Sequence, residues 1–242
     1  MEERENKKSS SIRKKKSWRK YGLEFLSIFI AVISAFALEN WRLANQENQS
    51  ETKILKEIAN GLEADLSDTR LNMAGHENGI KAAVFFLDLL EDKVENPDST
   101  GIYFHYLLRD FISIQNVAGY ETLKSKGLEL IKNDNLRLEI ISLYEYDYSS
   151  LKKLEEEYLE MQFFQSFFHQ INSILSPHFS FNSEGKLSGI KTPLNLTSKE
   201  KNLIKTYLWK IKLNREFILN FYKNLENRNE SLRQNILKEL DE

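Results

Sequence analysis

Along most of this chain, apolar residues recur every three or four positions, with charged and polar residues between them. This spacing places the apolar side chains on one face of an α-helix, so the pattern predicts a protein built mainly from helices. One stretch departs from it, because between Tyr21 and Leu38 the only charged residue is Glu24. A helix from Tyr21 to Trp41 would be about 30 Å long, the thickness of the hydrocarbon core of a bilayer.

The periodicity predicts six further helices after Trp41. They cover residues 54–73, 80–94, 103–114, 118–127, 136–175 and 197–236. Gly75 and Gly79 separate the first two, because glycine loosens a helix. Gly127 is placed to end the short fourth helix, Asn133 or Asp134 to cap the fifth, and Thr197 with Glu200 to form a capping box for the last.

The connection between the last two helices, residues 176–197, holds two of the three prolines and two of the nine glycines. Such a composition is typical of an irregular connection, and "NSEGKLSG" within it predicts a small β-hairpin.

The last helix carries a second pattern, in which isoleucine and leucine stand seven residues apart. These residues are Ile204, Ile211, Ile218, Leu225 and Leu232. Such a seam is typical of coiled coils and helical bundles, but Arg215 and Asn229 interrupt it. Both would be costly to bury in a symmetric two-stranded coil. We therefore expect this helix to pack antiparallel to residues 136–175 of its own chain, in an all-α bundle.

Charge is distributed unevenly along the chain, although the formal net charge is only −2. Residues 1–20 hold nine basic and three acidic residues, and the other 222 residues hold 25 basic and 33 acidic ones. A basic arm before an apolar run follows the positive-inside rule and favours membrane topology over nucleic-acid binding. We expect residues 1–20 in the cytoplasm, residues 21–41 across a bacterial inner membrane, and residues 42–242 as a periplasmic domain. Trp18, Tyr21 and Trp41 are the expected interfacial anchors.

Two alternatives to a retained membrane span remain. The basic start, the apolar run and the "AFA" triplet, Ala35 to Ala37, also fit a signal peptide that is cleaved after Ala37. No turn-forming residue precedes that cut, and residues 34–48 can continue as helix, which favours retention. A buried helix of a soluble protein explains the flanking charges least well.

Glu24 lies near the start of the apolar run, one turn after Lys20, where a headgroup-level ion pair would satisfy its charge. It also shares a helical face with three small residues, Ser27, Ala31 and Ala35. Small residues four apart let two membrane helices approach closely. Glu24 and this stripe are therefore candidates for a contact between two spans, and the chain is a candidate homo-oligomer.

Two motifs occur together in this chain. Gly22 and Glu24 open the apolar run and Asn40-Trp41 closes it; "YETLKSKG", residues 120–127, follows in the body. With these motifs the chain resembles a family of uncharacterised bacterial single-span membrane proteins, although here Leu23 separates the glycine from the glutamate. The resemblance covers about residues 20–160. It implies a retained span and a helical body, and it implies no activity.

We identify no catalytic, cofactor-binding or metal-binding residues from the sequence, and we expect no cofactor. The four histidines are His76, His105, His169 and His178, and none of them lies in a metal-ligand motif. There is no cysteine, which excludes disulfides and thiolate metal sites. Three tyrosines in "LYEYDYSSL", at positions 144, 146 and 148, are either mixed core and surface residues or the lining of a ligand pocket.

Two functions fit these observations better than an enzyme does. The first is a membrane-anchored helical interaction or scaffold protein, whose partners are the lipid bilayer and an unidentified protein. The second is a periplasmic ligand-binding or sensory domain, with a pocket near the tyrosines and the 176–197 connection. Because a 20-residue arm is too short to fold an output domain, signalling would need a partner. A hydrolase is the least favoured reading.

Overall fold

The structure, a computed structural model, describes residues 2–94 and 96–241, with side chains from Lys20 onward. Seven α-helices, short 3₁₀ and π segments and one two-stranded sheet make up this described part of the chain, which confirms the all-α fold. The α-helices are α1 (Glu2–Leu90), α2 (Thr100–Leu108), α3 (Ala118–Lys126), α4 (Asp134–Ile141), α5 (Ser149–Glu156), α6 (Phe163–Leu175) and α7 (Ser198–Asp241). The 3₁₀ segments are η1 (Pro97–Ser99), η2 (Leu128–Leu130), η4 (Leu159–Met161) and η5 (Ser176–His178), and the π segment is η3 (Ser142–Tyr148).

The chain divides into two compact units, Met1–Thr52 and Lys53–Glu242, which we call the N-terminal unit and the body. In the N-terminal unit, every described side chain from Lys20 to Gln49 is exposed. This part of α1 is long and apolar enough to cross a membrane, as judged by length and composition. It is the one such helix among the described residues.

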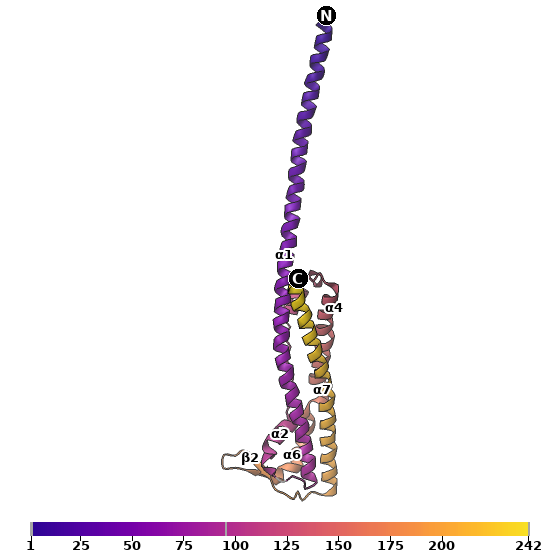
Figure 1. Ribbon diagram of the computed structural model, residues 1–242. Coiled ribbons are helices and arrows are strands. Elements are labelled where there is room, and N and C mark those ends of the chain that lie inside the picture. Colours follow the sequence, from indigo (N-terminus) through magenta and orange to yellow (C-terminus); the bar gives the residue numbers. More distant parts are fainter. Residues whose placement is uncertain (1, 95, 242) are drawn as a thin grey trace. The chain divides into compact units, whose positions relative to one another are not determined.

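In the body, α7 runs antiparallel to α1 and to the α4–α5 segment (Figure 1). Pairs of residues whose numbers rise on one helix and fall on the other show this direction. Along α1 and the turn that follows it, the pairs are Glu63–Arg233, Arg70–Glu226 and Glu91–Lys201. Between α7 and residues 133–160, the segment that holds α4 and α5, the pairs are Asn133–Glu239, Asp147–Arg228 and Glu160–Lys210. The prediction that the last helix packs within its own chain is confirmed.

The heptad seam of α7 forms the centre of the core. Its five apolar members, from Ile204 to Leu232, are at most 3% exposed, and burial of each such side chain contributes about 1.5–3 kcal/mol. Arg215 and Asn229, which interrupt the seam, are fully buried as well. Within the chain Arg215 donates to His76 and to backbone carbonyls, and Asn229 accepts from the Tyr148 hydroxyl, whereas Arg215 Nε and Asn229 Nδ2 make no hydrogen bond with any described residue.

The predicted break at Gly75 and Gly79 is wrong, because α1 continues to Leu90. The two glycines instead permit close packing. A Cβ at position 75 would lie 2.3 Å from the Phe111 ring, and one at position 79 would lie 2.4 Å from Arg215 Nε. Tertiary contacts at both positions outweigh the low helix propensity of glycine, about 1 kcal/mol per residue.

Two predicted helices are shorter than expected. The stretch predicted at 103–114 is helical only to Leu108. Residues 109–117, which we call the strap, have no regular secondary structure. The helix predicted over 136–175 is interrupted between Glu156 and Phe163.

The residues predicted to begin or end individual helices are confirmed. Asn133 caps α4 through Leu136 N–H, Gly127 ends α3 with φ at 103°, and Thr197 and Glu200 form the capping box. The expected hairpin pairs β1 (Phe179–Phe181) with β2 (Leu187–Ile190).

Candidate functional site

Arg215 is the largest fully buried side chain in the described part of the chain. One of its terminal nitrogens donates hydrogen bonds to three carbonyl oxygens, those of Tyr106 (3.2 Å), Leu107 (3.1 Å) and Arg109 (2.9 Å). These carbonyls lie at the C-terminal end of α2, where a helix leaves its last carbonyls unpaired and carries partial negative charge. The guanidinium of Arg215 therefore caps α2 from another helix.

His76 on α1 accepts the other hydrogen bond of Arg215, at 3.0 Å from Nδ1. Arginine can only donate, so the His76 ring carries its proton on Nε2. Burial, together with the charge of Arg215, lowers the pKa of His76 to about 3, and burial lowers that of Arg215 to about 9. At pH 7 the pair is therefore a neutral imidazole beside a charged guanidinium.

The strap is attached to the body by carboxylates that accept hydrogen bonds mainly from its backbone. Glu155 accepts from Ser113 N–H at 3.1 Å, Asp68 from Ile114 N–H at 3.1 Å, and Asp65 from Asn116 N–H at 2.7 Å. Asp65 and Glu155 are almost fully buried. Tyrosine hydroxyls on other elements complete their shells: Tyr148 donates to Asp65 and Tyr222 to Glu155.

Burial raises the pKa of these carboxyls, and the hydrogen bonds that attach the strap act in the opposite direction. Burial raises the pKa of Glu155 to about 7, and hydrogen bonds from Tyr222 and Ser113 oppose that shift. Burial also raises the pKa of Asp65. The sequence offered one signal for Asp65 that we missed: it lies among the core positions of α1, next to Leu62 and Leu66.

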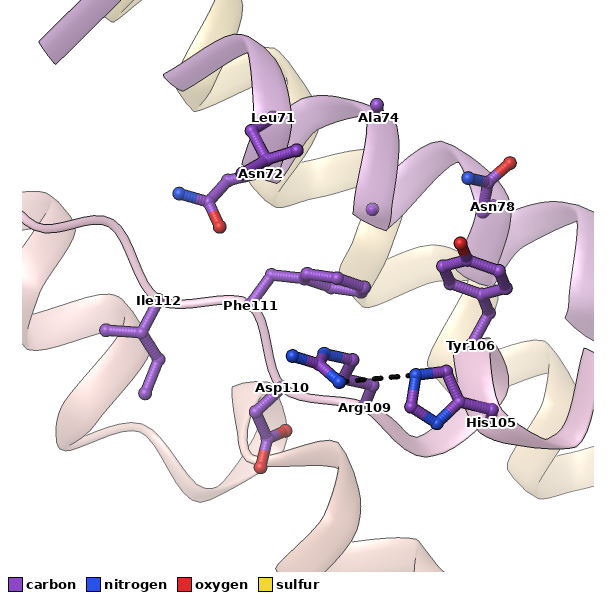
Figure 2. A pocket seen from close by; sticks show the side chains of 11 residues that line it. Leu71, Asn72, Ala74, Asn78, His105, Tyr106, Arg109, Asp110, Phe111 and Ile112 are labelled. Carbon is purple, nitrogen blue, oxygen red and sulfur yellow. Dashed lines mark hydrogen bonds between the residues drawn. The ribbon is translucent and has the colours of Figure 1, made fainter. Parts of the chain in front are cut away.

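We call Arg215, His76 and the three carbonyls at the end of α2 the Arg215 centre. A pocket of about 500 Å³ opens beside it. Its walls include Asn72 and Asn78 on α1, His105 and Tyr106 on α2, and strap residues 109–112. Figure 2 shows the two asparagines on one side of the Phe111 and Tyr106 rings, and Arg109 and His105 on the other. The Arg109 guanidinium lies 3.2 Å from His105 Nε2. We call this cavity the Phe111 pocket.

The tyrosines singled out in the sequence lie apart from this pocket. Tyr144 and Tyr148 line a separate cavity of about 390 Å³ with Tyr120, whereas Tyr146 is 68% exposed. Tyr144 stacks on Tyr120 at 4.5 Å between ring centroids. The 176–197 connection does not line that cavity; its Leu187 lines another, apolar one with Phe104 and Phe168.

The candidate residues of the span lie on the exposed surface of the N-terminal unit. Lys20 Nζ and Glu24 Oε1 are 3.9 Å apart, and the Ser27 hydroxyl donates to the Glu24 carbonyl. Ala31 and Ala35 follow on the same helix, and the four candidates Glu24, Ser27, Ala31 and Ala35 are all exposed. The anchors Tyr21 and Trp41 are 67% and 69% exposed, and Trp18 lies outside the residues whose side chains are described.

The body also exposes an apolar stripe on α7. Trp209, Leu213 and Phe217 are four residues apart and 59%, 44% and 52% exposed. Residues with this spacing lie on one helical face. Large apolar side chains gathered on one face of a folded body often mark an interaction site, whereas isolated ones do not.

Neither the Phe111 pocket nor any other place among the described residues gathers three or more side chains that could hold a metal ion. No known protein family, curated protein or solved structure matches this chain.

Proposed function

We propose that this protein is a membrane-anchored helical interaction protein. In this proposal residues 21–41 remain in a bacterial inner membrane, the basic arm lies in the cytoplasm, and the body binds a protein partner in the periplasm. The resemblance to single-span bacterial membrane proteins points the same way. The observation that carries the interaction role is the α7 stripe of Trp209, Leu213 and Phe217.

Two features support the anchor. The first is the fully exposed apolar part of α1, which has the length of a bilayer core. The second is the exposed Lys20–Glu24 pair at its start, where both charges can reach the headgroups. Because hydrocarbon is the solvent in which this surface would be stable, we expect the lipid bilayer to be a permanent partner.

Fractionation of cells tests the anchor. The full-length chain should stay with the membrane through carbonate and high-salt washes, because neither treatment removes a spanning helix. A soluble periplasmic chain that begins at Leu38 would contradict the proposal and establish a cleaved signal peptide.

Photo-crosslinking in intact cells tests the interaction role. A photoreactive amino acid at Leu213 should give a discrete crosslinked product, whereas the same amino acid at the exposed position Lys223, on the same helix, should not. Equal crosslinking from both positions, or none from Leu213, would contradict a specific partner at the stripe.

A further inference from the structure

Two arginines near Phe111 differ from all the others whose side chains are described. Five of the seven form salt bridges, namely Arg42, Arg70, Arg137, Arg228 and Arg233. Arg109 and Arg215 have no acidic group within salt-bridge distance among the described residues. Both guanidinium carbons lie within 6 Å of the Phe111 ring centroid, at 5.9 and 5.7 Å. Unpaired positive charge is thus concentrated around one aromatic ring.

The nearby carboxylate is engaged elsewhere. Asp110 accepts hydrogen bonds from Phe163 N–H at 2.6 Å and Phe164 N–H at 3.3 Å, at the start of α6. Figure 2 shows its carboxylate pointing away from the rings of Phe111 and Tyr106. Asp110 therefore stabilises the N-terminus of α6, where negative charge is favourable. Its charge also offsets part of that of Arg215, so Arg109 is the main positive group that faces the pocket.

The Phe111 pocket has the make-up of a small-molecule site. Its volume of about 500 Å³ falls within the range of about 300–1,000 Å³ of ligand pockets. Phe111 and Tyr106 give it an aromatic wall, and Asn72 and Asn78 give it amide groups (Figure 2). The Arg109 guanidinium has free N–H groups, since its hydrogen bond to His105 uses one nitrogen.

We propose that the Phe111 pocket binds a small organic anion, whose carboxylate or phosphate group meets the Arg109 guanidinium and whose apolar part lies against Phe111. The planar fork of arginine matches both oxyanions through paired hydrogen bonds. The buried charge of Arg215 behind Phe111 adds attraction that solvent screens poorly. This site is separate from the α7 stripe, so the two proposals stand or fall independently.

Three probes with one shared ring test the proposal on the full-length protein in a non-ionic detergent. Benzoate and phenyl phosphate carry the two candidate anionic groups, and benzamide is the uncharged isostere of benzoate. Ligand-observed NMR, with protein-free micelles as the blank, should show saturable binding of at least one anion and binding of benzamide weaker by about tenfold or more. Comparing the two anions distinguishes a carboxylate site from a phosphate site.

Charge changes at the pocket wall give the decisive comparison. Asn78→Asp should weaken anion binding and Asn78→Lys should strengthen it, because Asn78 is a half-buried wall residue whose replacement leaves the Arg215 centre intact. Arg109→Gln should weaken binding by about tenfold or more. The control Arg70→Gln, which removes an exposed salt-bridged arginine outside the pocket, should leave it unchanged.

Three results would overturn the proposal: no saturable binding of either anion, equal binding of benzamide and benzoate, or indifference of binding to both Asn78 changes. Circular dichroism of each variant separates lost binding from lost folding. If Arg109→Gln unfolds, the comparison of Asn78→Asp with Asn78→Lys is sufficient to test the proposal.

Discussion

Arg215 lies directly on Gly79: a Cβ at position 79 would come within 2.4 Å of Nε and 2.5 Å of Cζ of that side chain. The glycine is thus required by a side chain 136 residues away in the sequence. Since Arg215 is held by His76 and three carbonyls, it cannot move aside without losing hydrogen bonds.

Gly79→Ala should therefore destabilise the body. Alanine in an open helical position would stabilise it by about 1 kcal/mol, but here the clash should reverse the sign and lower the free energy of unfolding by about 1–3 kcal/mol. Urea denaturation followed by circular dichroism measures the change. Glu77→Ala, at an exposed position of the same turn, is the control and should be near neutral. A stabilised Gly79→Ala protein would show that the packing is looser than the structure indicates.

Arg215→Met should lower the free energy of unfolding by about 3 kcal/mol or more, because it leaves His76 and the α2 carbonyls without their donor. His76→Leu should lower the free energy of unfolding by less, since it removes only one hydrogen-bond acceptor of Arg215. The double variant should cost less than the sum of the two, because the residues share one hydrogen bond. Additive effects in this double-mutant cycle would mean that the pair is not coupled.

Glu155 should make stability depend on pH. Its folded pKa of about 7 lies above the ordinary glutamate value of 4.5, so between these values the folded state binds more protons than the unfolded state. Its contribution is complete below about pH 4.5 and is lost as pH rises towards 7.

Glu155→Gln should remove this contribution. Relative to the unmodified protein, the variant should gain up to about 3 kcal/mol between pH 4.5 and 7.5, because glutamine cannot ionise. The difference must be measured between the two proteins, since His76, whose pKa is lowered to about 3, acts in the opposite direction below about pH 6.5. A difference that is constant with pH would show that Glu155 titrates normally.

Ala31→Ile tests the small-residue stripe of the span. A larger side chain should keep two spans apart and reduce self-association of the full-length protein, which quantitative crosslinking in membranes can measure. Val32→Ile adds the same kind of bulk on another face and should have little effect. If Ala31→Ile changes nothing and the body alone dimerises tightly, the contact between copies lies in the body.

Sequence reasoning succeeded where the signal is local. The Asn133 cap, the Gly127 helix end and the Thr197–Glu200 box each depend on residues within four positions of one another. The α7 seam was predictable because burial follows helical period. Gly75 and Gly79 were misread because their role depends on Phe111 and Arg215, which only the fold brings near them. The Phe111 pocket was missed for the same reason: its walls come from α1, α2 and the strap.

The attachment of the strap has a consequence for sequence variation. Glu155, Asp68 and Asp65 bind backbone N–H groups, and every amino acid except proline has such a group. The outward residues Ile112 and Ile114 are 46% and 79% exposed, so a library randomised there should tolerate most amino acids while rejecting proline at 114. Around positions 112 and 114 the strap is thus held through its backbone by acidic residues that lie outside it, so the side chains at these two positions can vary while those of Asp110 and Phe111 cannot.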